Sequence, residues 1–167
     1  RYAGPKLGKE EYLHMMDAIF DDWWSAGKYT YEAEKKLAQI SDRNFGLLTN
    51  SGSSANLLLM AAAKELYFKD NDKILTLSCG FPTTEKEDVK GVFIAHTLGF
   101  KGDIDSILDI ARTKNIPVFF DACDAYGTKY KGLPIQSYGK AATFSFYVAH
   151  HITMGEGGGI VTNDENM

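Results

Sequence analysis

Cysteine is scarce in this chain of 167 residues, and long apolar runs and an excess of one charge are missing. Two cysteines, Cys79 and Cys123, are too few for the disulfide framework of a small secreted protein. No apolar stretch is long enough to span a bilayer, and no signal peptide is seen. A formal net charge of −4 without a basic run argues against binding to nucleic acid or to a membrane surface. We therefore expect a cytoplasmic protein.

The residues that are present predict one domain with a sizeable core, since 44% are hydrophobic and 24% are charged. Apolar residues at helical spacing, or in unbroken apolar runs, predict helices over 9–26, 30–40, 57–66 and 103–114. Short apolar runs predict strands over 45–49, 74–79, 92–95, 116–121, 141–147 and 160–162. Strands that alternate with helices indicate an α/β fold with a mostly parallel sheet.

One connection does not fit this alternation. Only about a dozen residues separate Cys79 from Val92, which is barely enough for a parallel crossover. Either the two strands form a hairpin, or residues are missing between Thr84 and Glu85.

The stretch from Thr143 to Gly158 changes from apolar and aromatic to polar and then to glycine. His150 and His151 follow the predicted strand, and ligands of open α/β sheets bind beyond the carboxyl ends of the strands. The alternative is a glycine-rich hairpin with two histidines at its tip.

Two further segments have the chemistry of a binding site. Ser51-Gly-Ser-Ser54 before an apolar helix can hold a phosphate through backbone N–H groups and hydroxyls, or it can simply cap the helix. Asp121 ends an apolar strand, where a carboxylate needs a partner such as a protonated ring nitrogen; it can also be a helix cap or a turn residue. Phe81 can stack on a flat ligand or pack in the core.

Taken together, four motifs in this order are specific. They are Ser51-Gly-Ser-Ser-Ala-Asn56, Gly80-Phe-Pro-Thr83, Phe120-Asp-Ala-Cys-Asp124 and the segment from Ser145 to Gly158. The chain resembles the DegT/DnrJ/EryC1/StrS sugar aminotransferase family, and within it the nucleotide-4-keto-6-deoxyhexose 3-dehydratase branch. The resemblance implies an aspartate-aminotransferase-like large domain, the PLP-dependent fold type I, and covers nearly the whole chain.

The decisive position is His150. Aminotransferases of the family carry a lysine there, which forms a Schiff base with pyridoxal phosphate (PLP). Imidazole cannot form that bond, but it can move protons near neutral pH. The resemblance therefore implies pyridoxamine phosphate (PMP) as the cofactor and His150 as the catalytic base.

The remaining site residues follow by matching motifs. The resemblance implies that Gly52, Ser53 and Ser145 bind the cofactor phosphate. Phe81 would stack on the ring, and Asp121 would pair with its nitrogen. Asp124 stands where many relatives have a glutamine near the ring hydroxyl.

Cys123 matches the first of four cysteines that hold a [2Fe–2S] cluster in some of these dehydratases. The other three would lie beyond Met167. On this basis we expect a cluster-containing enzyme with an iron–sulfur flavin reductase as partner. It would act as a homodimer that removes the C3 hydroxyl of a nucleotide-linked 4-keto-6-deoxyhexose in deoxysugar biosynthesis, as for lipopolysaccharide O-antigen.

Two alternatives remain, a PLP-dependent aminotransferase and an inactive phosphate-binding relative. Family members are about twice as long as this chain. We expect residues 1–167 to be a partial cofactor-binding domain with N-terminal helices, a missing segment near 84–85 and no C-terminal small domain.

Overall fold

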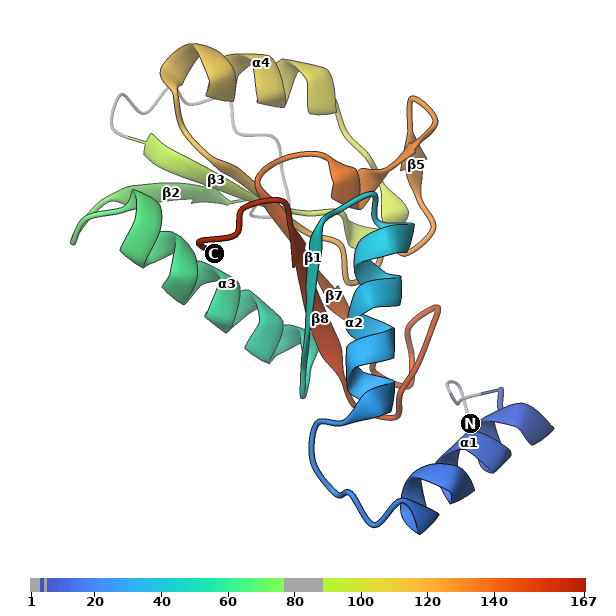
Figure 1. Cartoon of the computed structure of the whole chain (residues 1–167). Helices are drawn as coiled ribbons and strands as arrows, with labels where there is room; N and C mark the ends of the chain where they lie inside the picture. Colours follow the sequence, from blue (N-terminus) through green and yellow to red (C-terminus); the bar gives the residue numbers. More distant parts are fainter. Residues whose placement is uncertain (1–3, 5, 77–88) are drawn as a thin grey trace.

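The computed structural model describes residue 4, residues 6–76 and residues 89–167. Its main sheet has six strands in the order β1-β8-β7-β4-β3-β2 (Figure 1). The strands are β1 (Phe45–Thr49), β2 (Lys73–Thr76), β3 (Val89–Ala95), β4 (Val118–Asp121), β7 (Ala141–Ser145) and β8 (Gly158–Thr162). β2, β3, β4 and β7 are parallel, whereas β8 runs antiparallel to both of its neighbours. The mixed, mostly parallel sheet confirms the predicted α/β class.

Within the described residues four helices accompany the sheet: α1 (Lys9–Phe20), α2 (Lys28–Ile40), α3 (Gly52–Tyr67) and α4 (Ile104–Lys114). The described residues also form a small hairpin of β5 (Lys129–Tyr130) and β6 (Leu133–Pro134), with 3-10 turns at Thr97–Gly99 and Ile135–Ser137. β1, β3, β4, α2 and α4 agree with the predicted segments to within a few residues.

The two faces of the sheet bury different helices because side chains alternate along each strand. Phe119 of β4 is fully buried in the cluster that contains Ala55 and Leu59 of α3. Its neighbour Phe120, also fully buried, belongs to the cluster that contains Leu37 of α2 and Ile104 of α4. The core is therefore two apolar layers separated by the sheet, as in other helix-covered parallel sheets.

α3 begins earlier than its apolar run suggests. The predicted helix starts at Leu57, but the helix starts at Gly52. The hydroxyl of Ser51 accepts a hydrogen bond from the backbone N–H of Ser54 at 3.1 Å, which caps the first turn. Residues 52–56, which precede the predicted helix, are therefore its first turns. The capping expectation for the serine motif is confirmed, and the phosphate site stays a prediction.

The N-terminal helix is shorter than predicted. α1 ends at Phe20, and Asp22 has a φ of 55° in the turn that follows. Gly27, the residue just past the predicted end at residue 26, caps the start of α2. The apolar residues beyond Phe20 carried the helical pattern past the true end, because spacing alone does not detect a left-handed turn residue.

The connection that did not fit the alternation joins two parallel strands. β2 pairs in parallel with β3, so the hairpin alternative is wrong. β2 is described only as far as Thr76, and the predicted end of this strand at Cys79 lies outside the described residues.

The stretch from Thr143 to Gly158 combines both expectations for it. β7 and β8 pair as antiparallel neighbours, so the histidines lie in a hairpin connection. The same connection leaves the carboxyl end of β7, the edge at which the parallel strands end. β7 stops at Ser145 rather than at the predicted Tyr147, and β8 begins at Gly158 rather than at Ile160.

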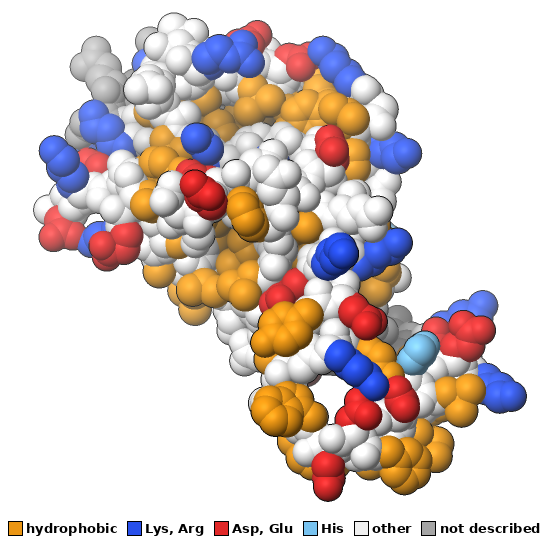
Figure 2. Space-filling model, in the orientation of Figure 1, with side chains coloured by type: hydrophobic (Ala, Val, Ile, Leu, Met, Phe, Trp, Pro, Cys, Tyr) orange, Lys and Arg blue, Asp and Glu red, His pale blue; other side chains and the backbone are white. Residues whose placement is uncertain are grey.

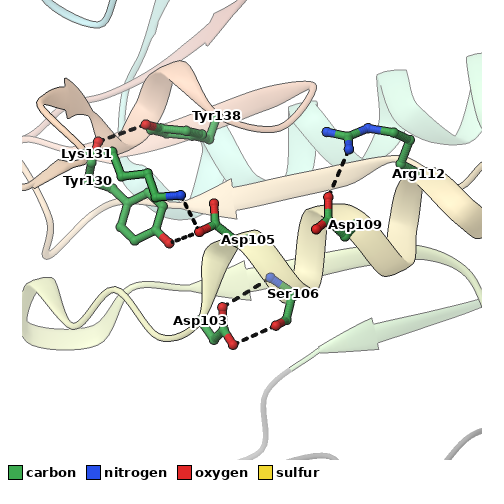
Figure 3. Close-up of polar contacts among 8 residues, drawn as sticks. All are labelled: Asp103, Asp105, Ser106, Asp109, Arg112, Tyr130, Lys131 and Tyr138. Atoms are coloured by element: carbon green, nitrogen blue, oxygen red, sulfur yellow. Dashed lines mark hydrogen bonds and ion pairs between the residues drawn. The ribbon is translucent and has the colours of Figure 1, made fainter.

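α4 is fixed by polar contacts at its first turn (Figure 3). Asp103 caps the helix by accepting from the backbone N–H of Ser106 at 3.1 Å. Asp105 accepts from the hydroxyl of Tyr130 at 2.8 Å and pairs with Lys131 at 2.5 Å, which ties the helix to the β5–β6 hairpin.

α1 stands away from the sheet, and apolar side chains gather along it (Figures 1 and 2). No residue of α1 is buried, and large apolar side chains of α1 and the residues after it are exposed, among them Ile19, Phe20, Trp23 and Trp24. Within the described part of the chain, no helix combines the length and hydropathy that a membrane span needs.

Candidate active site

Three backbone ends meet at one edge of the sheet. β4 ends at Asp121 and its parallel neighbour β7 ends at Ser145, so the carboxyl ends of both strands lie at this edge. The N-terminus of α3, which packs against β7, lies at the same edge, because Gly52 contacts Ser145. Free N–H groups and the helix dipole make such a helix end suitable for an anion.

Gly52 allows the first turn of α3 to pack closely against the ends of β4 and β7. A Cβ atom at Gly52 would lie 2.6 Å from Cβ of Ser145 and 3.0 Å from Sγ of Cys123. Contacts that short do not occur between real side chains, so only glycine lets the first turn of α3 approach the two strand ends this closely. The prediction that Gly52 and Ser145 share one site therefore agrees with their contact.

A second glycine supports the same close approach. A Cβ atom at Gly158, the first residue of β8, would lie 2.3 Å from the carbonyl oxygen of Ser51. Glycine at this position lets the end of the His150 loop pack directly on the backbone before α3. Gly155, within the loop, has a φ of 82°.

The carboxylate of Asp121 is held by two donors. Oδ1 accepts from the backbone N–H of Cys123 at 2.9 Å, and Oδ2 accepts from Nδ2 of Asn56 at 2.8 Å. A carboxylate has about four acceptor positions, so these bonds leave capacity for a further donor. The alternative of a helix cap does not apply, because no helix follows β4 directly. The bond to the N–H two residues on is instead that of a turn aspartate.

Cys123 lies next to both the Asp121 carboxylate and Gly52 at the N-terminus of α3. Burial raises the pKa of its thiol, and the neighbouring Asp121 raises it further. A raised thiol pKa disfavours the thiolate, which is the form that binds metals and attacks electrophiles. In the described part of the chain, no three metal-ligating side chains come together.

His150 contacts the second aspartate of the motif. Its Nδ1 lies 3.2 Å from Oδ1 of Asp124, and the two side chains are 22% and 39% exposed. The backbone N–H of His150 donates to the carbonyl of Tyr147 at 3.0 Å, which closes a turn just after β7. A partly exposed imidazole with one nitrogen on a carboxylate leaves its other nitrogen to face the site or solvent.

Six of the predicted site residues are joined by contacts: Gly52 with Ser145, Asp121 with Cys123 of the same motif, and Asp124 with His150. Ser53 is exposed on the first turn of α3, and His151 is exposed beside His150. Phe81 lies outside the described residues. A histidine outside this set, His96, is 2% exposed and packs on Phe120 at a ring-centroid distance of 4.6 Å.

Two residues of the edge had no predicted role. Asn56 bonds to Asp121, and Thr143 donates to Oδ1 of Asn56 at 2.6 Å. The available signal was an amide one turn after Gly52 at the start of an apolar helix. Its partner could not be predicted, because it comes from another part of the chain.

Comparison with known proteins identifies the family of the chain. The model of the DegT/DnrJ/EryC1/StrS aminotransferase family matches residues 5–89 and 84–167. The lipopolysaccharide biosynthesis protein RfbH of Salmonella typhimurium is 34% identical over 196 residues, which covers 96% of this chain and 45% of that protein. A GDP-perosamine synthase of Escherichia coli O157:H7 is 38% identical over 98% of this chain and 53% of its own length.

The fold is similar to that of solved structures. A crystal structure of GDP-4-keto-6-deoxymannose-3-dehydratase superposes with a TM-score of 0.91 at 23% identity, over 99% of this chain and 52% of the other. The chain thus spans about half the length of the proteins it matches. With nearly all of its residues matched by the family model, the chain belongs to the DegT/DnrJ/EryC1/StrS aminotransferase family.

Proposed function

We propose that the full-length protein is a PMP-dependent 3-dehydratase that acts on a nucleotide-linked 4-keto-6-deoxyhexose. The observation that carries the proposal is His150, an imidazole paired with Asp124 at the edge where family aminotransferases place a lysine. RfbH is an example of a relative in lipopolysaccharide biosynthesis, and a 3-dehydratase is similar in fold. A role in surface-polysaccharide deoxysugar synthesis fits both.

The described residues fit the cofactor at two positions. The close approach at Gly52 presents the N-terminus of α3 to an anion, which suits the phosphate group. The Asp121 carboxylate, already oriented by two donors, has acceptor capacity left for a pyridinium N–H. When bound, PMP would supply an amine that condenses with the keto group of the sugar and a ring that accepts electrons.

His150 is the proposed catalytic base and acid. Because Nδ1 lies 3.2 Å from Oδ1 of Asp124, the carboxylate favours the tautomer with its proton on that nitrogen, which leaves a lone pair on Nε2. Such a nitrogen can remove a proton at neutral pH and return it to a leaving hydroxyl group. Asp124 would thereby orient His150, a role different from the expected contact with the ring hydroxyl.

The described residues supply at most one ligand for an iron–sulfur cluster. Such a cluster needs several thiolates, whereas Cys123 is the only cysteine in the described part of the chain and its pKa is raised. We assign no step to a cluster. The cluster and a partner reductase remain predictions from the resemblance, as does the homodimer.

One alternative has support from a relative, since the 38% identical GDP-perosamine synthase has another activity by name. An aminotransferase needs a primary amine at position 150 to hold PLP, and this chain has imidazole there. An inactive phosphate-binding relative would need only the Gly52 edge. That alternative gives no functional reason for the contact between Asp124 and His150.

Three observations support the expectation of a missing segment near residues 84 and 85. The family model matches in two pieces that overlap there, 5–89 and 84–167. The aligned span with RfbH, 196 residues, also exceeds the length of this chain. The parallel pairing of β2 with β3 agrees, since the intervening residues 77–88 are few for a crossover.

The test is the replacement His150→Lys in the full-length protein. We expect C3 deoxygenation to be lost and PLP to become attached to the new lysine, so that borohydride fixes it covalently. His151→Lys is the matched control, because His151 is the exposed neighbour and should leave deoxygenation intact. Unchanged deoxygenation in the His150→Lys protein would remove His150 from the mechanism.

A further inference from the structure

A chain of hydrogen bonds connects three elements behind Asp121. The hydroxyl of Thr143 donates to Oδ1 of Asn56 at 2.6 Å, and Nδ2 of Asn56 donates to Oδ2 of Asp121 at 2.8 Å. Thr143 is fully buried in β7, Asn56 is half-buried in α3, and Asp121 ends β4. None of the motifs that define the catalytic positions requires this contact.

The chemistry of the groups determines which way the amide faces. An ionised carboxylate can only accept hydrogen bonds, so the NH₂ side of Asn56 must face Asp121. The carbonyl side then faces Thr143, whose hydroxyl must donate to it. Thr143 thus selects the one amide orientation that serves the carboxylate, and it does so from a site that water does not reach.

Asn56 belongs to the helix that would bind the cofactor phosphate, and it contacts the aspartate that would pair with the cofactor ring. Asn56 lies four residues after Gly52, about 6 Å along the axis of α3. The same helix therefore presents its N-terminus to the phosphate and an amide to the acid that would pair with the ring. The phosphate and the ring nitrogen of PMP are a fixed distance apart in one small molecule. The contact between α3 and β4 therefore sets the matching distance in the protein, between the N-terminus of α3 and the Asp121 carboxylate.

We propose that Asn56 is the positioning residue of Asp121 and that Thr143 orients it. The inference rests on the proposed PMP site, which it deepens. Asn56 holds the carboxylate so that its remaining acceptor positions face the ring, and it couples that orientation to the helix that binds the phosphate. Asn56 does not touch the reacting atoms, and its effect passes through Asp121.

The experiment compares two probes, PMP and inorganic phosphate, on the full-length protein. Asn56→Leu removes the donor to Asp121 at similar volume, so we expect PMP to bind about tenfold more weakly, the loss typical of one hydrogen bond to a charged group. Phosphate affinity should stay within about twofold, because the backbone at Gly52 is untouched. A merely structural role in α3 would weaken both probes together.

Thr143 provides a second, independent variant. Thr143→Val removes the hydroxyl at nearly constant shape and should weaken PMP about threefold, since the amide can then turn. Thr143→Ser keeps the hydroxyl and should restore the affinity. In an Asp121→Ala background, Asn56→Leu should cause no further loss, because its partner is gone.

The outcomes separate the inference from the function on which it rests. If the unaltered protein binds no PMP, the proposed function fails and the inference with it. If the unaltered protein binds PMP but Asn56→Leu leaves that affinity unchanged, or weakens phosphate equally, the positioning role is wrong while the proposed function stands. Equal affinities in Thr143→Val and Thr143→Ser would remove the orienting role of Thr143.

Discussion

Nδ1 of His150 lies 3.2 Å from Oδ1 of Asp124, and this contact joins the loop after β7 to the loop after β4. A carboxylate beside one imidazole nitrogen selects the tautomer with its proton on that nitrogen. The other nitrogen is then an acceptor. Asp124 and His150 thus form a pair whose geometry suits a base at Nε2.

Replacing Asp124 by asparagine should reverse that tautomer. The amide can donate to Nδ1, which moves the proton to Nε2 and blocks the base. We expect kcat to fall on the order of a hundredfold while KM changes little, because proton transfer rather than binding is affected. Nitrogen-15 NMR of the imidazole checks the tautomer directly. Asp109→Asn, at an exposed aspartate of α4, is the matched control, and an unchanged tautomer in Asp124→Asn would contradict the pairing.

Gly52→Ala should disrupt the proposed phosphate site at the N-terminus of α3. The added methyl group would lie 2.6 Å from Cβ of Ser145, so α3 must move away from the strand ends. We expect PMP affinity to fall at least about tenfold and stability to fall by about 1–3 kcal/mol from overpacking. Fluorescence titration and urea unfolding measure the two effects.

Gly8→Ala is the matched control for this substitution. A Cβ atom at Gly8 meets only the end of the Glu11 side chain, at 3.1 Å, which can move aside. Affinity should remain unchanged in that protein. A Gly52→Ala protein that binds PMP normally would show that the close approach is not needed for the cofactor.

Cys123 should react slowly with thiol reagents. Burial and the neighbouring Asp121 raise the pKa of its thiol, so little thiolate is present at neutral pH. We expect iodoacetamide at pH 7.5 to modify Cys123 far more slowly in the folded protein than in urea. Peptide mass spectrometry distinguishes it from Cys79. Rapid modification of the folded protein would indicate an accessible thiolate, and with it a better candidate for a metal ligand.

His96 should make stability depend on pH. Burial lowers the pKa of its imidazole, although the Phe100 carbonyl and the charge of Asp121 act in the opposite direction. An unfolded histidine titrates near about pH 6.5, so the contribution of His96 to stability is complete above that pH. It is lost as the pH falls from about 6.5 through the lower pKa of the folded state.

His96→Gln tests this dependence because glutamine does not titrate. The difference in the free energy of unfolding between the unaltered protein and His96→Gln should shrink as the pH is lowered from 7 to 5. Urea unfolding at several pH values measures it, with His151→Gln as the control at an exposed histidine. A difference that is constant over this range would show that His96 does not stay neutral in the fold.

Much of the fold was determined locally and could be predicted. α4 begins after Asp103 as expected, because a capping side chain and one apolar face lie within a single stretch. The apolar runs of β4 and β7 likewise predicted strands buried on both faces. The serine motif and the strand-end Asp121 carry their chemistry in adjacent residues, so both could be named as candidate site residues, although a helix cap and a turn residue remained as alternatives.

Only the tertiary structure decided which residues meet. β2 and β3 pair in parallel, whereas their spacing in the sequence had left a hairpin and a crossover open. Gly52 needs to be glycine because Ser145 and Cys123, distant in sequence, lie against it. The bonds from Thr143 to Asn56 and from Asn56 to Asp121 join β7, α3 and β4. Residue types predict which groups can bond, but a buried group takes the partner that the packing of distant elements brings within about 3 Å.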